Sequence, residues 1–385
     1  MDPKALLQER TELFDNAFHF RHNKRVPLGC NLWSWMVLDC GYKQSEALQS
    51  YDRMEQIIRE IHDRYQFDAY HNLLVRNPIH LTNQLGGGCS WFDPTDEFIQ
   101  CADINYMAKD EYAEYMENPN RFFWSKALPR YTKWNDKDFT LTLGGLKKAM
   151  EEYDRFLGYC RRIVDINRDD YGALMYYTTT VTPALDDFLV CLRGIKGLSI
   201  DLRKNKEQLL EALDRHWERR YVPVLKSAME VGKKPGYISA ISCALLGHSI
   251  LSPKQFGEFY WRHLKQMIDA AIEHNQQIYL FAEASILHFA EYFEEVPKGV
   301  LMIHLEQDDI FEFRKRLPNI AVAGGMPSAL LGHGTKEECV DYAKKLIDEL
   351  GDGFVLCQNK MIAYRSDCTR ENLMAVCDFA RNYTL

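Results

Sequence analysis

The sequence lacks the features that mark a membrane or secreted protein. No apolar run among its 385 residues approaches the roughly 20 consecutive residues that a bilayer-spanning helix needs. The N-terminal stretch MDPKALLQERTELFDNAFHF mixes charged and apolar residues, which is typical of an amphipathic helix and not of a signal peptide. We therefore expect a soluble, cytoplasmic protein that has no membrane partner.

Cysteine is present but is not arranged for disulfide bonds. The 11 cysteines are scattered along the chain, and no Cys-x-x-Cys pair occurs. An odd number of cysteines without regular spacing predicts reduced thiols in a reducing compartment.

A basic face is also missing. The formal net charge is -8, and acidic and basic residues are interleaved along the chain. This pattern gives no electrostatic footprint for nucleic acid or for an anionic membrane. The chain has no low-complexity tract, internal repeat or domain linker, and 46% of its residues are hydrophobic. Residues 1–385 are thus expected to form a single domain with a large core.

What the chain does contain is organised around the stretch 251–284, which reads LSPKQFGEFYWRHLKQMIDAAIEHNQQIYLFAEA. Ser252 followed by Pro253 predicts a helix start, because a hydroxyl accepts from an unpaired backbone amide and proline presets φ. Apolar residues then recur at helical spacing as far as His274. The apolar run 278–282 predicts a strand. Glu283 stands at its carboxyl end, where a parallel barrel places its chemistry.

Hydrophobic periodicity predicts further helices and strands along the chain. The expected helices are 1–23, 45–65, 143–165, 183–194, 206–230, 310–316, 336–350 and 370–383. The expected strands are 26–35, 69–75, 174–179, 236–242, 300–305, 320–324 and 354–357. Strand and helix alternate from residue 174 onward, which is typical of parallel strands with helical crossovers. About eight strands favour closure, so we expect an α/β fold that forms a single (β/α)8 TIM-type barrel with an N-terminal helical extension.

One long irregular segment, 79–138, precedes this alternation. It is rich in Gly, Asn, Asp, Pro and aromatic residues, and it contains GGG at 86–88 and the run FFWSKALPRYTKW. Excursions of this length are usually functional or form an oligomer contact. We interpret it either as a lid that faces the substrate or a partner, or as the surface of a homodimer.

Three segments of the C-terminal half resemble the uroporphyrinogen decarboxylase superfamily in order and spacing. They are LSPKQFGEFYWRHLKQMIDAAIEHNQQIYLFAEAS, VLMIHLEQDDIFEFRKRLP and NIAVAGGMPSALLGHGTKEECVDYAKKLIDELGDGFVLCQNKMI. In that family, Leu-Ser-Pro before an amphipathic helix, a Gly-Asn-Val-Asp-Pro-like turn and a Gly-Phe-Ile-Leu strand recur. The middle element here is GGMPSALL from Gly324. The resemblance covers residues 236–385 and implies the barrel of this superfamily.

The resemblance also separates possible reactions. The superfamily contains decarboxylases, which carry an arginine-rich motif of the MRQAGRY type that holds substrate carboxylates. The corresponding segment here, GCNLWSWMVLDCGY, has aromatic residues and no arginine. Because aromatic side chains cannot offset the desolvation of several carboxylates, this argues against a tetrapyrrole decarboxylase. An aromatic or methylated substrate fits better.

The other branches of the superfamily are methyltransferases that use zinc and a corrinoid protein. The thiol-methylating branch carries His-x-Cys at the strand that reads YLFAE here, where this chain has Phe281 and Glu283. The methyltransferase components of O-demethylases use carboxylate and histidine ligands, and this chain is similar to them in Glu283 and His304, which end successive strands. A further acidic ligand of that branch has no match, since Ile268 stands at the corresponding position.

The resemblance implies a zinc ion held by Glu283 and His304. Cys357, at the end of the last predicted strand, is our candidate third ligand. Glu306 lies two residues beyond His304, points the same way along the strand and is a further catalytic candidate. In the alternative interpretation, Glu283 pairs with a loop arginine, His304 bonds within a polar barrel mouth, and Cys357 is a small buried apolar residue.

Seven residues near predicted strand ends are candidates for an aromatic substrate slot, although half of them would serve equally as core. They are Trp33, Trp35, Tyr176, Tyr177, Tyr237, Phe281 and Met326. Together these expectations describe a methyltransferase that passes a methyl group from a small aromatic methyl ether to the cobalamin of a separate corrinoid protein. A lyase that decarboxylates a small aromatic acid and a non-catalytic barrel are the alternatives.

Overall fold

The protein is described from a computed structural model that covers residues 2–70, 79–88, 90–103, 105–131, 142–176 and 178–385. Tyr177 of the expected aromatic slot and residues 71–75 of an expected strand lie outside these ranges. Within them, none of the helices combines the length and the apolar composition that crossing a bilayer requires.

Parallel strands follow one another around a ring. They are β1 (Gly29–Cys30), β2 (Ala69–Tyr70), β5 (Leu174–Met175), β6 (Thr179–Thr180), β7 (Ile241–Leu245), β8 (Ile278–Ala282), β9 (Leu301–Leu305), β10 (Ala321–Met326) and β11 (Phe354–Gln358). Hydrogen bonds join them in the orders β1-β2-β5 and β11-β10-β9-β8-β7-β6. Parallel bridges from Leu28 to Leu356 and from Met175 to Tyr237 connect the two groups. Since β5 and β6 share one segment, the described strands form the expected (β/α)8 barrel.

The stretch 251–284 folds as its sequence predicts. Ser252 caps the helix, because its hydroxyl accepts from the Gln255 backbone amide. In return, the Gln255 Oε1 accepts from the Ser252 backbone amide. α14 (Pro253–Gln255) passes through a π-helical turn into α15 (Arg262–Glu273), and the chain then enters β8. The apolar face of α15 packs on the ring through fully buried side chains such as Leu264 and Met267.

The N-terminal helix α1 (Pro3–Phe18) closes the amino end of the ring. Its Phe14 and Phe18 are fully buried in one cluster with inward-facing strand residues. Arg10 fixes the helix, because its Nε bonds the Asp68 carboxylate at 2.9 Å just before β2. Burial alone would raise the pKa of Asp68, but Arg25 and Arg10 hold it below its ordinary value. The open end of the barrel is therefore the carboxyl end.

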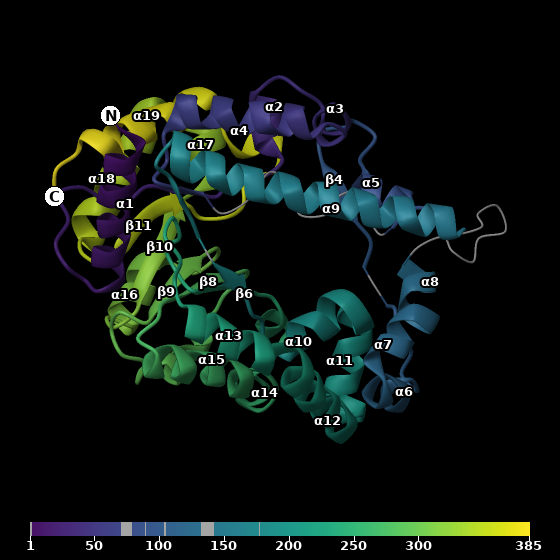
Figure 1. Cartoon of the computed structure of the whole chain (residues 1–385). Coiled ribbons are helices and arrows are strands. Elements are labelled where there is room, and N and C mark those ends of the chain that lie inside the picture. The colour runs from purple at the N-terminus through teal and green to yellow at the C-terminus, as the bar shows by residue number, and fades with distance from the viewer. Residues whose placement is uncertain (1, 71–78, 89, 104, 132–141, 177) are drawn as a thin grey trace.

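Helices cover the outside of the ring (Figure 1). Between β1 and β5 the chain forms α2 (Trp35–Asp39), α3 (Gln44–Leu48), α4 (Tyr51–Tyr65) and the long α9 (Leu143–Asp165). A separate group of helices precedes β7, made of α10 (Ala184–Asp187), α11 (Gly194–Lys204), α12 (Lys206–His216) and α13 (Val222–Val231). The remaining helices are α16 (Ile310–Arg316), α17 (Ser328–His333), α18 (Lys336–Leu350) and α19 (Arg370–Asn382).

The insertion has more secondary structure than its composition suggested. It contains α5 (Ile79–Asn83), an antiparallel hairpin of β3 (Ser90–Phe92) and β4 (Ile99–Cys101), α6 (Tyr112–Glu117), α7 (Pro119–Phe122) and α8 (Leu128–Tyr131). In Figure 1, α6 and α7 lie beside the α10–α12 group, away from the two termini, whereas α5 lies beside α9. Residues 132–138 of the expected insertion fall outside the described ranges.

Candidate active site at the barrel mouth

Two neighbouring strands carry polar side chains to the carboxyl end of the ring. Phe281 of β8 pairs in register with His304 of β9, and the two rings lie 4.6 Å apart. Side chains two residues apart on a strand share a face. Glu283 and Glu306 therefore follow Phe281 and His304 on the inward side, each one residue past its strand end. Both carboxylates are half-buried.

His304 is held deep in this site as a neutral ring. It is 1% exposed, and its Nε2 lies 2.8 Å from the carbonyl oxygen of Gln358 and 3.0 Å from that of Asn359. Because carbonyl oxygens only accept, Nε2 carries the proton, and Nδ1 accepts the 2.6 Å hydrogen bond of the Tyr279 hydroxyl. Burial lowers the pKa of His304 to about 4.

A second buried pair lies against Tyr279. The rings of Tyr176 and Tyr279 are 4.5 Å apart, and the Tyr176 hydroxyl is 3.9 Å from the Cys357 Sγ. Cys357 is 1% exposed, and burial raises its pKa to about 12, so the thiol stays protonated at neutral pH. Gly29 makes room for this pair, since a side chain there would overlap the Tyr176 hydroxyl.

These contacts bear on the expected zinc ligands. Both nitrogens of His304 already have partners, and the Cys357 thiol is buried and protonated. Within the described ranges, no three His, Cys, Asp or Glu side chains are grouped so as to hold a metal ion. As placed, Glu283, His304 and Cys357 do not fit a zinc site. No reaction step is therefore assigned to zinc. Whether the protein binds zinc stays a prediction.

Glu306 supports the loop that carries Glu283. Its Oε2 accepts from the backbone amide of Ala284 at 2.9 Å, and Ala284 has a left-handed φ of 64°. A non-glycine residue rarely adopts this conformation unless its surroundings hold it there. Asp308 continues the support by accepting from the amides of Ile286 and Leu287 at 2.7 and 3.0 Å. The structure thus gives Glu306 a positioning contact, and a catalytic role for it stays a prediction.

Aromatic side chains do gather at the mouth, but they differ from the expected set. Trp33 is half-buried just beyond β1 and meets the Phe98 ring edge-on at 5.9 Å. Phe98 stacks on Tyr364 at 4.5 Å. Sequence reasoning missed Phe98 and Tyr364, because one belongs to the insertion and the other to the loop after β11. The insertion therefore contributes a wall of the mouth.

Two residues of the expected slot lie in the core outside the ring. Trp35 is 3% exposed, donates its indole N–H to the Cys368 carbonyl at 3.0 Å and packs on Tyr65. Trp35 belongs to α2, so its side chain lies on the buried face of that helix and does not continue the side-chain direction of strand β1. Met326 is 1% exposed in the same outer core. Its placement in the slot relied on its position just past the predicted strand 320–324, but β10 continues through Met326 after two glycines with positive φ.

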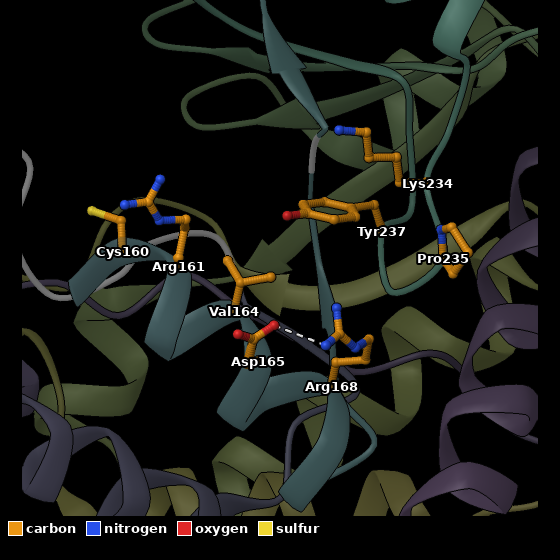
Figure 2. Close-up of a pocket in the computed structure, with 8 residues that line it drawn as sticks. All are labelled: Cys160, Arg161, Val164, Asp165, Arg168, Lys234, Pro235 and Tyr237. Carbon is orange, nitrogen blue, oxygen red and sulfur yellow. Dashed lines mark hydrogen bonds and ion pairs between the residues drawn. The ribbon is translucent and has the colours of Figure 1, made fainter. Parts of the chain in front are cut away.

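Tyr237 lies at the other end of the strands. It precedes β7 and therefore marks the amino end, because that strand begins later than its sequence predicted. Figure 2 shows it in a surface pocket, with Lys234 and Pro235 beside it and Val164 and Asp165 of α9 below. Tyr176 and Phe281 do face the ring interior, but both are fully buried beneath the mouth.

Comparisons with known proteins agree with this architecture. The family described as uroporphyrinogen decarboxylase (URO-D) matches residues 226–383. A methyltransferase from Methanosarcina mazei is similar in structure, with a TM-score of 0.63 and 12% sequence identity over 97% of this chain and 98% of that one. No curated protein matches the sequence. The family match covers the C-terminal part of the chain, and the likeness in fold covers almost the whole chain.

Proposed function

We propose that this protein is a methyltransferase that moves a methyl group from a phenyl methyl ether to the cobalt of a separate corrinoid protein. The observation that carries the proposal is the position of Glu283, a half-buried acid at the carboxyl edge of β8, above a ring interior filled with aromatic side chains. In parallel barrels this edge is where chemistry takes place.

Two further observations support a neutral methylated substrate. The segment Gly29–Tyr42 at the first strand has no arginine or lysine, so it offers no cation to a substrate carboxylate. The structurally similar protein from Methanosarcina mazei is a methyltransferase. The match to the uroporphyrinogen decarboxylase family favours a second candidate, a lyase that releases carbon dioxide from a small aromatic acid.

The proposed step breaks one bond and forms one. The methyl carbon leaves the ether oxygen and joins the reduced cobalt, which supplies the electron pair of the new bond. The oxygen keeps the pair of the old bond and requires a proton to leave as a phenol. Glu283 is the proton donor in this proposal, and such general acids contribute roughly 10²–10⁴-fold to a rate. His304 is not the proton donor, because its one N–H already bonds two carbonyl oxygens. Its role in the proposal is to position the residues of the mouth.

The cobalt reaches the site on a partner. We propose that the corrinoid protein docks over the carboxyl end of the barrel, where the hairpin β3–β4 contributes Phe98 to the mouth. Trp91 on the same hairpin is 46% exposed and is suited to such a contact. A homodimer surface is the alternative use of the insertion.

The experiment uses free cob(I)alamin as the methyl acceptor and methoxybenzene and 2-methoxyphenol as donors. The proposal predicts methylcobalamin in the visible spectrum and an equal amount of phenol or catechol. Benzoate and 2-methoxybenzoate serve as the parallel test of the lyase. Carbon dioxide release without methylcobalamin would support the lyase and contradict the methyltransferase.

Zinc is tested separately by metal analysis of the purified protein. Stoichiometric zinc that is lost on Glu283→Ala and kept on Glu273→Gln, an exposed control at the end of α15, would support the predicted site. Metal-free protein that still transfers methyl groups would contradict it.

A further inference from the structure

Among the described residues, the side chain of Asn31 is buried without hydrogen-bond partners. Asn31 lies one residue past β1 and is 1% exposed. Its backbone is satisfied, because its N–H donates to the Gln358 Oε1 at 2.8 Å and its carbonyl accepts from the Ile362 amide at 3.0 Å. Neither Oδ1 nor Nδ2 of the side chain has a partner among the described residues. Because most buried side-chain polar atoms have a hydrogen-bond partner, this amide calls for a partner that the described residues do not supply.

The amide faces the ring interior. Two residues earlier, Gly29 points inward, since a side chain there would meet Tyr176 and Cys357. Cys30 and Leu32 belong instead to the core outside the ring. Because side chains alternate along a strand, Asn31 shares the inward face with Gly29, one step closer to the mouth.

Asn31 also lies beside the candidate active site. Gln358 connects the two, since its carbonyl oxygen accepts from His304 and its side chain accepts from the Asn31 backbone. Trp33, the aromatic residue of the mouth, comes two residues after Asn31 along the chain. Asn31 therefore lies between Trp33 at the mouth and Gln358, which bonds His304.

We infer that Asn31 is a substrate-binding residue that recognises a hydrogen-bond donor and an acceptor on neighbouring atoms of a neutral ligand. Its Oδ1 can only accept and its Nδ2 can only donate. A plain ether or a carboxylate only accepts and would leave Oδ1 unpaired. The inference rests on the proposed function for the ligand class, and it narrows that class to aryl methyl ethers that carry a free hydroxyl beside the methoxy group.

Binding of a matched pair of probes tests the inference without cobalt. 2-Methoxyphenol and methoxybenzene differ by one hydroxyl. By isothermal titration calorimetry, the wild-type protein is expected to bind 2-methoxyphenol at least tenfold more tightly, because a site built for a hydroxyl rejects the analogue that lacks it. In Asn31→Leu the two affinities should agree within twofold. An unchanged preference in Asn31→Leu, or no binding of either probe to the wild type, would overturn the inference.

The melting temperature without ligand is a second test, because it distinguishes a binding asparagine from one that stabilises the fold. Asn31→Leu removes two unpaired polar atoms at similar volume, so its Tm is expected to rise. Asn372 is the matched control, because its buried Nδ2 donates to the carbonyls of Leu331 and Gly334 at 3.0 and 2.8 Å. Asn372→Leu should lower the Tm and keep the probe preference. A Tm that falls in Asn31→Leu would contradict the inference.

The two proposals fail in different ways. If cob(I)alamin is never methylated but the probe preference exists and depends on Asn31, the methyltransferase proposal is wrong and the binding site stands. If methyl transfer takes place and Asn31→Leu keeps the preference, the binding site is wrong and the methyltransferase proposal stands.

Discussion

The Tyr279 hydroxyl donates to His304 Nδ1 at 2.6 Å inside the barrel, because two carbonyl oxygens on the other side of the ring hold the imidazole proton on Nε2. Both residues are buried, and they come from adjacent strands, β8 and β9. The other side of the imidazole donates to the chain at the end of β11. The pair thus ties three strands together directly beneath the mouth.

Removing this hydroxyl should destabilise the protein. Tyr279→Phe leaves the His304 Nδ1 buried without a donor, which costs about 1–3 kcal/mol in the free energy of unfolding. Urea denaturation measures the loss. Tyr383→Phe is the control, because its hydroxyl bonds Asp348 at the surface and its loss should cost under about 0.5 kcal/mol. Equal effects in the two variants would show that the buried bond has no special weight.

The His304 ring should stay neutral in mildly acidic solution. Its folded-state pKa is about 4, whereas an imidazole in the unfolded chain titrates near pH 6.5. The unfolded state therefore binds the proton first as the pH falls. The stability that the neutral ring contributes is complete above about pH 6.5 and is lost between about pH 6.5 and 4, by about 3 kcal/mol in total.

NMR of ring-labelled histidine tests this directly. The His304 signal, assigned by its loss in His304→Gln, should show a neutral ring at pH 5.5, with a proton on Nε2 and none on Nδ1. An imidazolium at that pH would contradict the assignment. A site-specific signal is needed because burial also lowers the pKa of His62 and of His248, to about 3 and about 4.

The absence of a side chain at Gly29 should matter for packing. A methyl group there would overlap the Tyr176 hydroxyl and lie 3.3 Å from the Cys357 side chain. Gly29→Ala is expected to cost about 1–3 kcal/mol by overpacking. Adding Tyr176→Phe should recover part of that loss, as a double-mutant cycle in urea would measure. Strictly additive effects would show that the two positions do not interact.

Glu283 should affect the rate more than the stability. Glu283→Gln keeps the shape and removes the acid, so methyl transfer should fall by roughly 10²–10⁴-fold. The exposed control Glu273→Gln should leave the rate unchanged. Stopped-flow spectroscopy of cob(I)alamin measures both. A Glu283→Gln variant with the wild-type rate would remove this residue from the proposed chemistry.

Elements with strong periodicity could be predicted from the sequence. α9, α16 and α18 begin and end at the expected residues, and β8 and its terminal Glu283 lie where the apolar run placed them. The helix expected over 206–230 is instead α12, a π-helical turn and α13, because a sequence period does not distinguish a π turn from a regular one. α11 and the hairpin β3–β4 were missed in segments with weak or mixed patterns.

The candidate site was predicted only along single strands. Glu283 and His304 were placed together because they end successive parallel strands. Period-two alternation would also have identified Tyr279, which shares a face with Glu283. The carbonyl partners of His304 come from β11 and the residue after it, and contacts made by backbone atoms of distant segments leave no mark on side-chain patterns. The unpaired amide of Asn31 is likewise visible only once its neighbours are placed.

The central claim is tested most directly by the fate of a labelled methyl group. 2-Methoxyphenol with carbon-13 in its methyl group is incubated with the protein and cob(I)alamin, and the products are followed by carbon-13 NMR. The account predicts that the label appears as methylcobalamin, in step with catechol. Label that remains in the ether, or that appears as methanol without methylcobalamin, would contradict it.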